Sequence, residues 1–211
     1  AALGAARARP ADQAIALVTQ RGIARAEAAQ ERPGSLAAIL GLADEVVESL
    51  CRRISNVWPA NYNCPGQIVI SGEDAAVVEC CAQAEEEGAR RAVRLRVSGA
   101  FHSPLVARAA DRLRPAVDKI HFADPRHAFM STVTARLEGA GRYRELLVEQ
   151  LTAPVKFTQA ARGLIGKGVT VFVEVGPGNV LSGLLKRIDR NVRTLQVSDL
   201  AELRELEETL A

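Results

Sequence analysis

His102 is the residue of this sequence best suited to acid–base chemistry. It lies in the segment Gly99–Leu105 (GAFHSPL), after a predicted strand and directly before Ser103, a helix-capping residue. Loops between a strand and a helix carry reactive groups in many α/β folds, and an imidazole titrates near neutral pH, as a general acid or base must. A histidine that only packs or caps such a loop is the commoner case, so position alone leaves both interpretations open.

Arg21 is the second candidate, as a residue that binds an anion. On its predicted helix it shares a face with Leu17, Ala24 and Ala28, and no Asp or Glu lies three or four residues away. Arg25, one turn further on, has the same charge, which is unfavourable unless an anion is near. An inward-facing guanidinium needs a carboxylate or phosphate from elsewhere. A solvated surface arginine, or one paired with another element, remains the alternative.

Other candidate features are weaker. The segment Gly176–Asn179 (GPGN) lies between an apolar strand and a helix, where backbone N–H groups could bind an anion. It matches neither GxGxxG nor a P-loop, and a plain tight turn is the simpler interpretation. No GxSxG motif of a serine nucleophile occurs in the sequence, and the possible nucleophiles Cys64 and Ser103 lie in no such motif.

Composition restricts the class of protein. The chain has 211 residues, of which 48% are hydrophobic, 25% charged and 4% aromatic, with a net charge of +2. This excludes a disordered chain, a collagen-like fibre and a disulfide-rich miniprotein, and is typical of a cytosolic globular protein. The mild charge argues against nucleic-acid binding, and no apolar run predicts a membrane span. The four cysteines form no CxxC pair, so we expect reduced thiols and no metal site.

The elements that position these residues begin with a helix predicted over Ala11–Glu31, which Pro33 and Gly34 end. A block over residues 36–97 follows in the order β-α-β-β-α-β, which is typical of a ferredoxin-like subdomain. Its predicted strands and helices are Leu36–Leu42, Asp44–Ile54, Val57–Asn63, Gln67–Gly72, Asp74–Ala89 and Arg91–Val97.

The rest of the chain alternates helices with strands. Its predicted elements are a helix from Ser103 through Val117, a strand at His127–Val133, helices around Tyr143–Leu151 and Phe157–Ile165, a strand at Val169–Val175, a helix at Asn179–Ile188, a strand at Val192–Val197 and a final helix. The nearly unbroken apolar strand Val169–Val175 predicts burial on both faces of a parallel sheet. We therefore predict an α/β fold in which residues 1–35 and 98–211 form one domain, interrupted by the subdomain of residues 36–97.

Three longer segments resemble one enzyme family. They are Pro59–Gly72 (PANYNCPGQIVISG), Gly99–Leu105 and Glu174–Ile188 (EVGPGNVLSGLLKRI). Together they resemble the malonyl-CoA:acyl-carrier-protein transacylases of fatty-acid synthesis, with the acyltransferase domains of polyketide synthases as the near alternative. The resemblance covers nearly the whole chain. It implies a partial α/β-hydrolase-like domain with a parallel sheet and an inserted ferredoxin-like subdomain, in agreement with the predicted elements.

The resemblance also implies a ping-pong reaction without a cofactor or metal. A serine of a GHSLGE-type motif would take the malonyl group from malonyl-CoA and pass it to the phosphopantetheine thiol of acyl carrier protein. His102 would be the general base, and Gln150 would orient it through its backbone carbonyl. Arg21 would bind the malonyl carboxylate, and Phe101 would crowd the space that an α-methyl branch needs. The expected enzyme is cytoplasmic and monomeric when complete, with no nucleic-acid or membrane partner.

The sequence departs from the family pattern in several places. It begins just after the expected serine motif, so we expect the C-terminal part of a transacylase, inactive alone because its nucleophile lies outside the chain. Arg25 and Ala26 stand where the family usually has Met and Gln, and Cys64 replaces a serine. An alternative is a catalytically inactive chain that still binds carrier protein or coenzyme A, for which the basic residues at 186–190 are candidates, although such a helix face is usually only solvated.

Overall fold

The computed structural model describes residues 2–6, 8, 10–97 and 99–210. The chain is an α/β protein that folds as two compact units, Ala1–Ala160 and Ala161–Ala211. Residues 1, 98 and 211, at which the predicted domains begin or end, lie outside the described residues. None of the helices described is long and apolar enough to cross a membrane.

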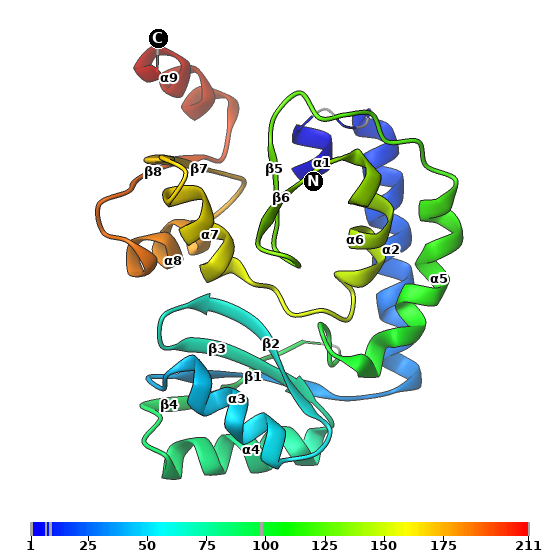
Figure 1. Cartoon of the computed structure of the whole chain (residues 1–211), viewed down its shortest axis with the longest axis vertical. Helices are drawn as coiled ribbons and strands as arrows, with labels where there is room; N and C mark the ends of the chain where they lie inside the picture. Colours follow the sequence, from blue (N-terminus) through cyan, green and yellow to red (C-terminus); the bar gives the residue numbers. More distant parts are fainter. Residues whose placement is uncertain (1, 7, 9, 98, 211) are drawn as a thin grey trace. The chain divides into compact units, whose positions relative to one another are not determined.

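Helices make up one part of the first unit (Figure 1). α2 (Ala11–Glu31) has the predicted bounds and follows the short α1 (Ala2–Ala5). It packs against α5 (Ala107–Asp118), which the 3-10 turn η1 (Pro104–Val106) precedes, and α5 contacts α6 (Tyr143–Glu149). Their shared core consists of Ala24, Ala28, Val106, Ala109, Leu113, Val117, Val148 and Leu151. The small alanines of α2 allow α5 to approach it closely.

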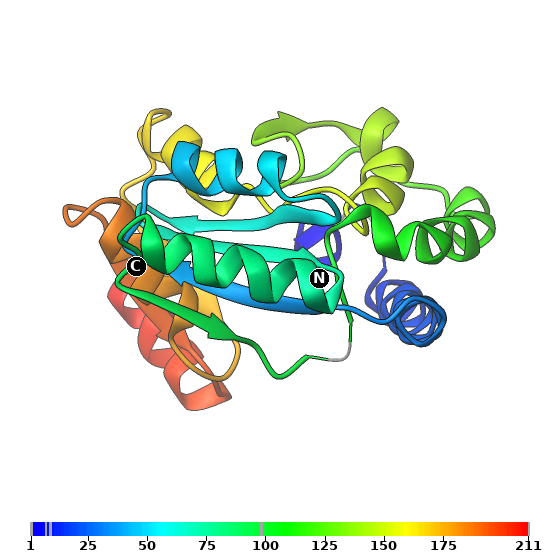
Figure 2. The same cartoon turned by 90° about the horizontal axis from the view of Figure 1, so that it is seen from below.

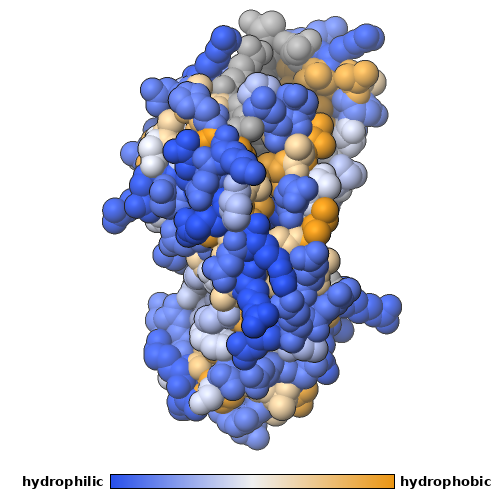
Figure 3. All heavy atoms as spheres, turned by 90° about the vertical axis from the view of Figure 1, so that its right-hand side faces the viewer, coloured by the Kyte–Doolittle hydropathy of each residue, from blue (hydrophilic) through white to orange (hydrophobic). Residues whose placement is uncertain are grey.

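The outer side of α2 and α5 carries charged side chains. Arg108 and Arg112 of α5 both form ion pairs with Glu31 of α2. Hydrophilic side chains predominate on this side of the molecule (Figure 3). Such exposed pairs contribute about 0–1 kcal/mol each, so apolar packing on the inner face holds the two helices together.

A four-stranded antiparallel sheet forms another part of the first unit. Its strands are β1 (Ser35–Leu40), β2 (Val57–Cys64), β3 (Gln67–Gly72) and β4 (Arg91–Arg94), in the order β2-β3-β1-β4. The order of elements is the predicted one, but β4 is shorter than predicted. The pairing of β4 with β1 ends at Arg94, opposite Ala37, and past it Leu95 N–H still donates to Leu36 O at 2.8 Å.

Two helices cover one face of this sheet (Figure 2). They are α3 (Asp44–Arg53) and α4 (Asp74–Glu86), which lie in the chain on either side of the β2–β3 hairpin. Side chains alternate along β1 and pack on both faces of the sheet. Ala37 and Ile39 pack against the helices, while Leu36 packs on the opposite face.

A short hairpin and a loop complete the first unit. β5 (Phe129–Ser131) pairs antiparallel with β6 (Arg136–Glu138). After α6, the chain runs along β2: Tyr62 N–H donates to Val155 O at 2.9 Å, and Val155 N–H donates to Ala60 O at 2.8 Å. These two hydrogen bonds attach the loop that follows α6 to the edge of the four-stranded sheet.

The second unit has a parallel pair of strands. β7 (Val171–Val175) and β8 (Arg193–Val197) pair in register, with α8 (Val180–Ile188) as the crossover helix and α9 (Leu200–Leu210) after β8. α7 (Phe157–Ile165) begins in the first unit and ends in the second. This order is a β-α-β unit, as predicted from the sequence.

The prediction that β7 is buried on both faces is wrong. Val171, Val173 and Val175 are all exposed, and Val175 is 80% exposed. Phe172 and Glu174, on the other face, are partly buried, and Glu174 bonds to the start of α8. Within the part of the chain described, α8 covers one face of β7 only, and the apolar composition of the strand does not reveal this.

Candidate active site

The loop that carries His102 has an unusual backbone conformation. His102 has a φ of 59°, in the left-handed region that residues other than glycine rarely adopt. Its N–H donates to Leu151 O at 3.2 Å, and the buried Ser103 Oγ donates to Ala100 O at 2.6 Å. Ser103 Oγ also accepts from Leu105 N–H at 3.3 Å and so caps η1, as predicted. Backbone strain maintained by surrounding hydrogen bonds is typical of functional sites.

The His102 side chain is oriented by a backbone carbonyl. Nδ1 lies 3.1 Å from Ala153 O, and because a carbonyl can only accept, Nδ1 carries the proton and Nε2 has the free lone pair. Burial lowers the pKa of His102, and the charges of Arg25 and Arg21 lower it further, while the carbonyls of Ala153 and Gln150 act in the opposite direction. The imidazole is therefore neutral at neutral pH and can accept a proton at Nε2.

Gln150 lies at the site, and its backbone carbonyl is the weaker of two acceptors for His102. From the sequence, that carbonyl is expected to orient His102, whereas Nδ1 donates to Ala153 O, three residues later. The Gln150 carbonyl has a smaller effect on the pKa of His102. Because the chain turns between α6 and the segment along β2, several carbonyls approach the imidazole, and the sequence does not indicate which one is nearest.

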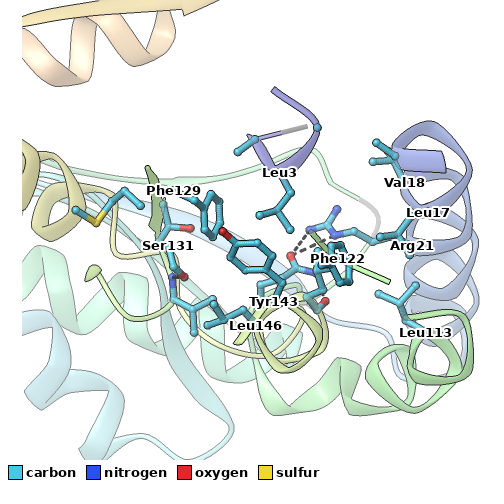
Figure 4. Close-up of a pocket in the computed structure, with 18 residues that line it drawn as sticks. Leu3, Leu17, Val18, Arg21, Leu113, Phe122, Phe129, Ser131, Tyr143 and Leu146 are labelled. Carbon is cyan, nitrogen blue, oxygen red and sulfur yellow. Dashed lines mark hydrogen bonds between the residues drawn. The ribbon is translucent and has the colours of Figure 1, made fainter. Parts of the chain in front are cut away.

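The Gln150 side chain binds Arg21 (Figure 4). Its Oε1 accepts from Arg21 Nε at 3.2 Å and from Nη2 at 2.7 Å, and its Nε2 donates to Leu147 O at 3.0 Å. Burial lowers the pKa of Arg21, but a guanidinium remains charged at neutral pH. No acidic side chain among the described residues pairs with Arg21, which agrees with the sequence analysis of its helix face.

A cavity of about 470 Å³ lies beside this pair. Arg21 and Gln150 contribute charged and amide groups to its wall, whereas most of the lining is apolar. The apolar lining comes chiefly from Leu3, Leu17, Val18, Leu113, Phe122, Phe129, Val133, Tyr143, Leu146 and Leu147 (Figure 4). Of the four predicted site residues, Arg21 and Gln150 line this cavity, whereas Phe101 and His102 do not.

Phe101 is packed between the helices and a cation. Its ring contacts the core that α2 and α5 share, and the Arg25 guanidinium lies over it, with Cζ 3.8 Å from the ring centroid. The sequence indicates Arg25 as a like charge one turn from Arg21 on the same helix face, and as a departure from the family pattern. Its contact with Phe101 joins residues far apart in the chain, for which the sequence carries no local signal.

The GPGN segment is a tight turn. Gly176 and Gly178 have φ values of 126° and 92°, which require glycine. The first free N–H groups of α8 donate to the Glu174 carboxylate, from Leu181 at 3.0 Å and from Ser182 at 2.8 Å. An anion of the chain itself thus occupies the helix start, and the simpler of the two sequence interpretations holds.

Comparisons with known proteins agree with this description. Residues 1–204 match the family described as the acyl transferase domain. A malonyl CoA-acyl carrier protein transacylase of Bacillus subtilis (strain 168) is 41% identical over 203 residues, which are 94% of this chain and 64% of that protein. The crystal structure of a malonyl-CoA:acyl carrier protein transacylase from Xanthomonas oryzae pv. oryzae is 38% identical, with a TM-score of 0.92 over 99% of this chain and 68% of that one.

A third relative was solved as a complex. This malonyl-transacylase, bound to a type II PKS acyl-carrier protein, is 36% identical, with a TM-score of 0.93 over 98% of this chain and 68% of that one. The matches place the chain among α/β acyl transferase domains. It belongs to the malonyl-CoA:acyl-carrier-protein transacylase family of these domains. The chain spans 64% of the length of the first curated relatives that it matches.

Proposed function

We propose that this chain supplies the general base and the carboxylate-binding residues for malonyl transfer from malonyl-CoA to acyl carrier protein. The observation that carries the proposal is His102, whose Nδ1 donates to Ala153 O, beside arginines that have no acidic partner among the described residues. A base with a free Nε2 and a neighbouring site for a carboxylate are what transfer of a short dicarboxylic acyl group requires.

The proposed reaction proceeds in two half-reactions. A serine hydroxyl attacks the thioester carbonyl of malonyl-CoA while His102 Nε2 accepts its proton; the C–S bond then breaks, and the proton passes to the coenzyme A sulfur. In the second half-reaction, the phosphopantetheine thiol of the carrier protein attacks the malonyl-serine carbonyl while His102 Nε2 accepts the thiol proton; the serine ester C–O bond then breaks, and the proton passes to the serine oxygen. Arg21 binds the free carboxylate in both. Neither step is an oxidation or reduction, so we propose no metal or redox cofactor.

The nucleophile in this proposal lies outside residues 1–211. No GxSxG motif occurs in the sequence. Among the described residues, no hydroxyl or thiol donates to His102 Nε2, and the matched family members are longer than this chain. The complete protein would act in the cytoplasm, as a monomer, in fatty-acid synthesis rather than in a polyketide pathway.

We also propose how the four-stranded sheet of the first unit and the parallel strand pair of the second unit each fit the family architecture. The sheet order β2-β3-β1-β4 with two helices on one face fits a ferredoxin-like subdomain at residues 36–97. The parallel β7–β8 pair with its crossover helix fits one edge of an α/β-hydrolase-like sheet. The strands that would complete that sheet are not among the described residues.

A chimera tests the function. The part of the Bacillus subtilis relative that precedes its match to this chain is joined to residues 1–211, so that a serine motif is present. Incubation with malonyl-CoA should add one malonyl group to that serine, seen by intact mass, and added carrier protein should remove it. Chimeras with His102→Ala or Arg21→Ala should acquire the adduct far more slowly, while Arg108→Ala, at an exposed arginine of α5, should behave as the parent.

Two results would contradict parts of the proposal. A folded chimera that acquires no malonyl group would refute the assigned activity and leave carrier-protein or coenzyme A binding as the alternative. A malonyl adduct on residues 1–211 alone would refute the placement of the nucleophile outside them. The unchanged mass of the chain alone is the expected result.

A further inference from the structure

Arg25 lies at the proposed site and has no role in the reaction as described so far. It follows Arg21 by one helical turn on α2, and its guanidinium lies over the Phe101 ring at 3.8 Å from Cζ to the ring centroid. Burial and the charge of Arg21 lower the pKa of Arg25 to about 10. This value is still far above neutral pH, so both arginines are charged there.

The two positive charges are not balanced by this chain. The ion pairs of the described residues involve other arginines, at positions 32, 52, 53, 94, 108 and 112. No carboxylate in the described part of the chain pairs with Arg21 or Arg25. Two like charges one turn apart in a partly desolvated place are unfavourable, so the arrangement favours an anion taken from solution.

The N–H groups of the two arginines are not equally available. Arg21 donates from Nε and Nη2 to Gln150 Oε1, whereas its Nη1 makes no hydrogen bond with the described residues and can donate to a ligand. The Arg25 guanidinium lies over the Phe101 ring. It makes no hydrogen bond or ion pair with the described residues, so its N–H groups can bind a carboxylate through two parallel hydrogen bonds.

We propose that Arg25 is a second carboxylate-binding residue, which holds the free carboxylate of a short dicarboxylic acyl group together with Arg21 Nη1. This inference rests on the proposed function and deepens it. Its consequence is stronger discrimination between an acyl group that ends in a carboxylate and a neutral one of similar size.

Calorimetric titration of the full chain with malonyl-CoA and with acetyl-CoA tests the proposal, because the two ligands differ only in the free carboxylate. The wild-type chain should bind malonyl-CoA more tightly. Arg25→Met should weaken malonyl-CoA binding about tenfold, the loss of a charge-assisted contact, and leave acetyl-CoA binding unchanged. Arg25→Lys keeps the charge but not the planar pair of donors, so its affinity for malonyl-CoA should lie between those of wild type and Arg25→Met. Arg108→Met, which removes an exposed positive charge, is the control.

The NMR titration of His102 distinguishes a binding role from a structural one. The charge of Arg25 lowers the pKa of His102, so Arg25→Met should raise it while the loop stays folded. Wild-type protein that fails to discriminate between the two ligands, or Arg25→Met protein that discriminates as well as wild type, would overturn the proposal. If only Arg21→Met abolishes discrimination, this inference falls and the proposed function stands. If discrimination depends on Arg25 but the chimera transfers no malonyl group, the proposed function falls instead.

Discussion

Two neighbouring carbonyls of one segment determine the position of His102. Leu151 O accepts from its backbone N–H, and Ala153 O accepts from its side chain. The left-handed φ of 59° is therefore stabilised from outside the loop that contains it. At the scale of single residues, the basicity of His102 depends on burial and on charges from α2, while its orientation depends on the segment after α6.

The lowered pKa of His102 predicts a dependence of stability on pH. The folded state binds a proton at this imidazole less readily than the unfolded chain, whose pKa is near the ordinary value of 6.5. As pH falls through that value, the unfolded chain takes up the proton first, so the free energy of unfolding decreases. Urea unfolding at about pH 7.5 and about pH 5.5 should show a smaller decrease for His102→Gln than for wild type.

The control for this prediction is His127→Gln, a substitution at an exposed histidine that makes no described contact with the site. It should retain the wild-type dependence on pH. Equal dependence in His102→Gln and wild type would show that His102 is not destabilised in its protonated form.

Substitution of Gln150 tests whether its side chain positions Arg21. Gln150→Leu leaves Arg21 Nε and Nη2 partly buried without their acceptor, and should lower the free energy of unfolding by about 1–3 kcal/mol. Gln150→Glu restores an acceptor and adds an internal anion, so it should recover stability but weaken malonyl-CoA binding. Chemical unfolding and calorimetric binding measure the two effects. Equal malonyl-CoA affinity in Gln150→Glu and wild type would contradict this role.

The residue types of the site could be selected from the sequence, but not their contacts. Arg21 and His102 stand out by chemistry and by their position on predicted elements. The Arg21–Gln150 contact joins residues 129 positions apart, and no local pattern encodes such a separation. A few backbone angles in the turn after α6 determine that His102 Nδ1 lies closer to Ala153 O than to Gln150 O.

At the scale of elements, the end of β3, where Gly72 lies opposite Val57 of β2, tolerates no side chain. A Cβ there would overlap Asn56 O and lie 2.7 Å from Val57 Cα, both backbone atoms that cannot move aside. Gly72→Ala should therefore lower the free energy of unfolding by about 1–3 kcal/mol. Gly22→Ala, in α2 with no atom within 4 Å of the new Cβ, should raise it by about 0.4–1 kcal/mol. Urea unfolding of both variants tests this pair, and equal effects would contradict it.

Strongly patterned elements could be predicted well from the sequence. α2 and β3 have the predicted bounds because an alanine-rich segment and a short apolar run each end at a glycine or proline nearby. β4 is shorter than predicted because its pairing with β1 ends at Arg94, opposite Ala37, and the sequence of β4 does not mark this end. The exposure of β7 was mispredicted because an apolar strand looks the same whether one face or two are covered.

At the scale of the whole molecule, apolar side chains remain uncovered in the second unit. The large exposed ones there are Val171, Val173, Val175, Val180, Leu181, Leu200 and Leu203. A contiguous group of such residues marks an interaction surface or a liability to aggregation. The chain should therefore bind a dye such as ANS in its folded state.

Substitution on β7 tests whether this strand is the source of the dye binding. Val173→Thr together with Val175→Thr should reduce ANS fluorescence while changing the free energy of unfolding by no more than about 0.5 kcal/mol per site, because both positions are exposed. Val77→Thr, at a fully buried position of α4, should instead destabilise the first unit. A cooperative melt without ANS binding by the wild-type chain would contradict the prediction.

The hydrogen bonds between Val155 and β2 couple the position of His102 to that of the four-stranded sheet. Ala153, which orients His102, is two residues from Val155, which exchanges two hydrogen bonds with the sheet edge. A rigid-body rotation of the sheet would therefore move Ala153 O, which orients the His102 imidazole. The rotation of the sheet and the orientation of the base would then change together. Relaxation-dispersion NMR should then give the same exchange rate for the amides of Tyr62 and His102, and Val155→Pro, which removes one of the two bonds, should separate the rates.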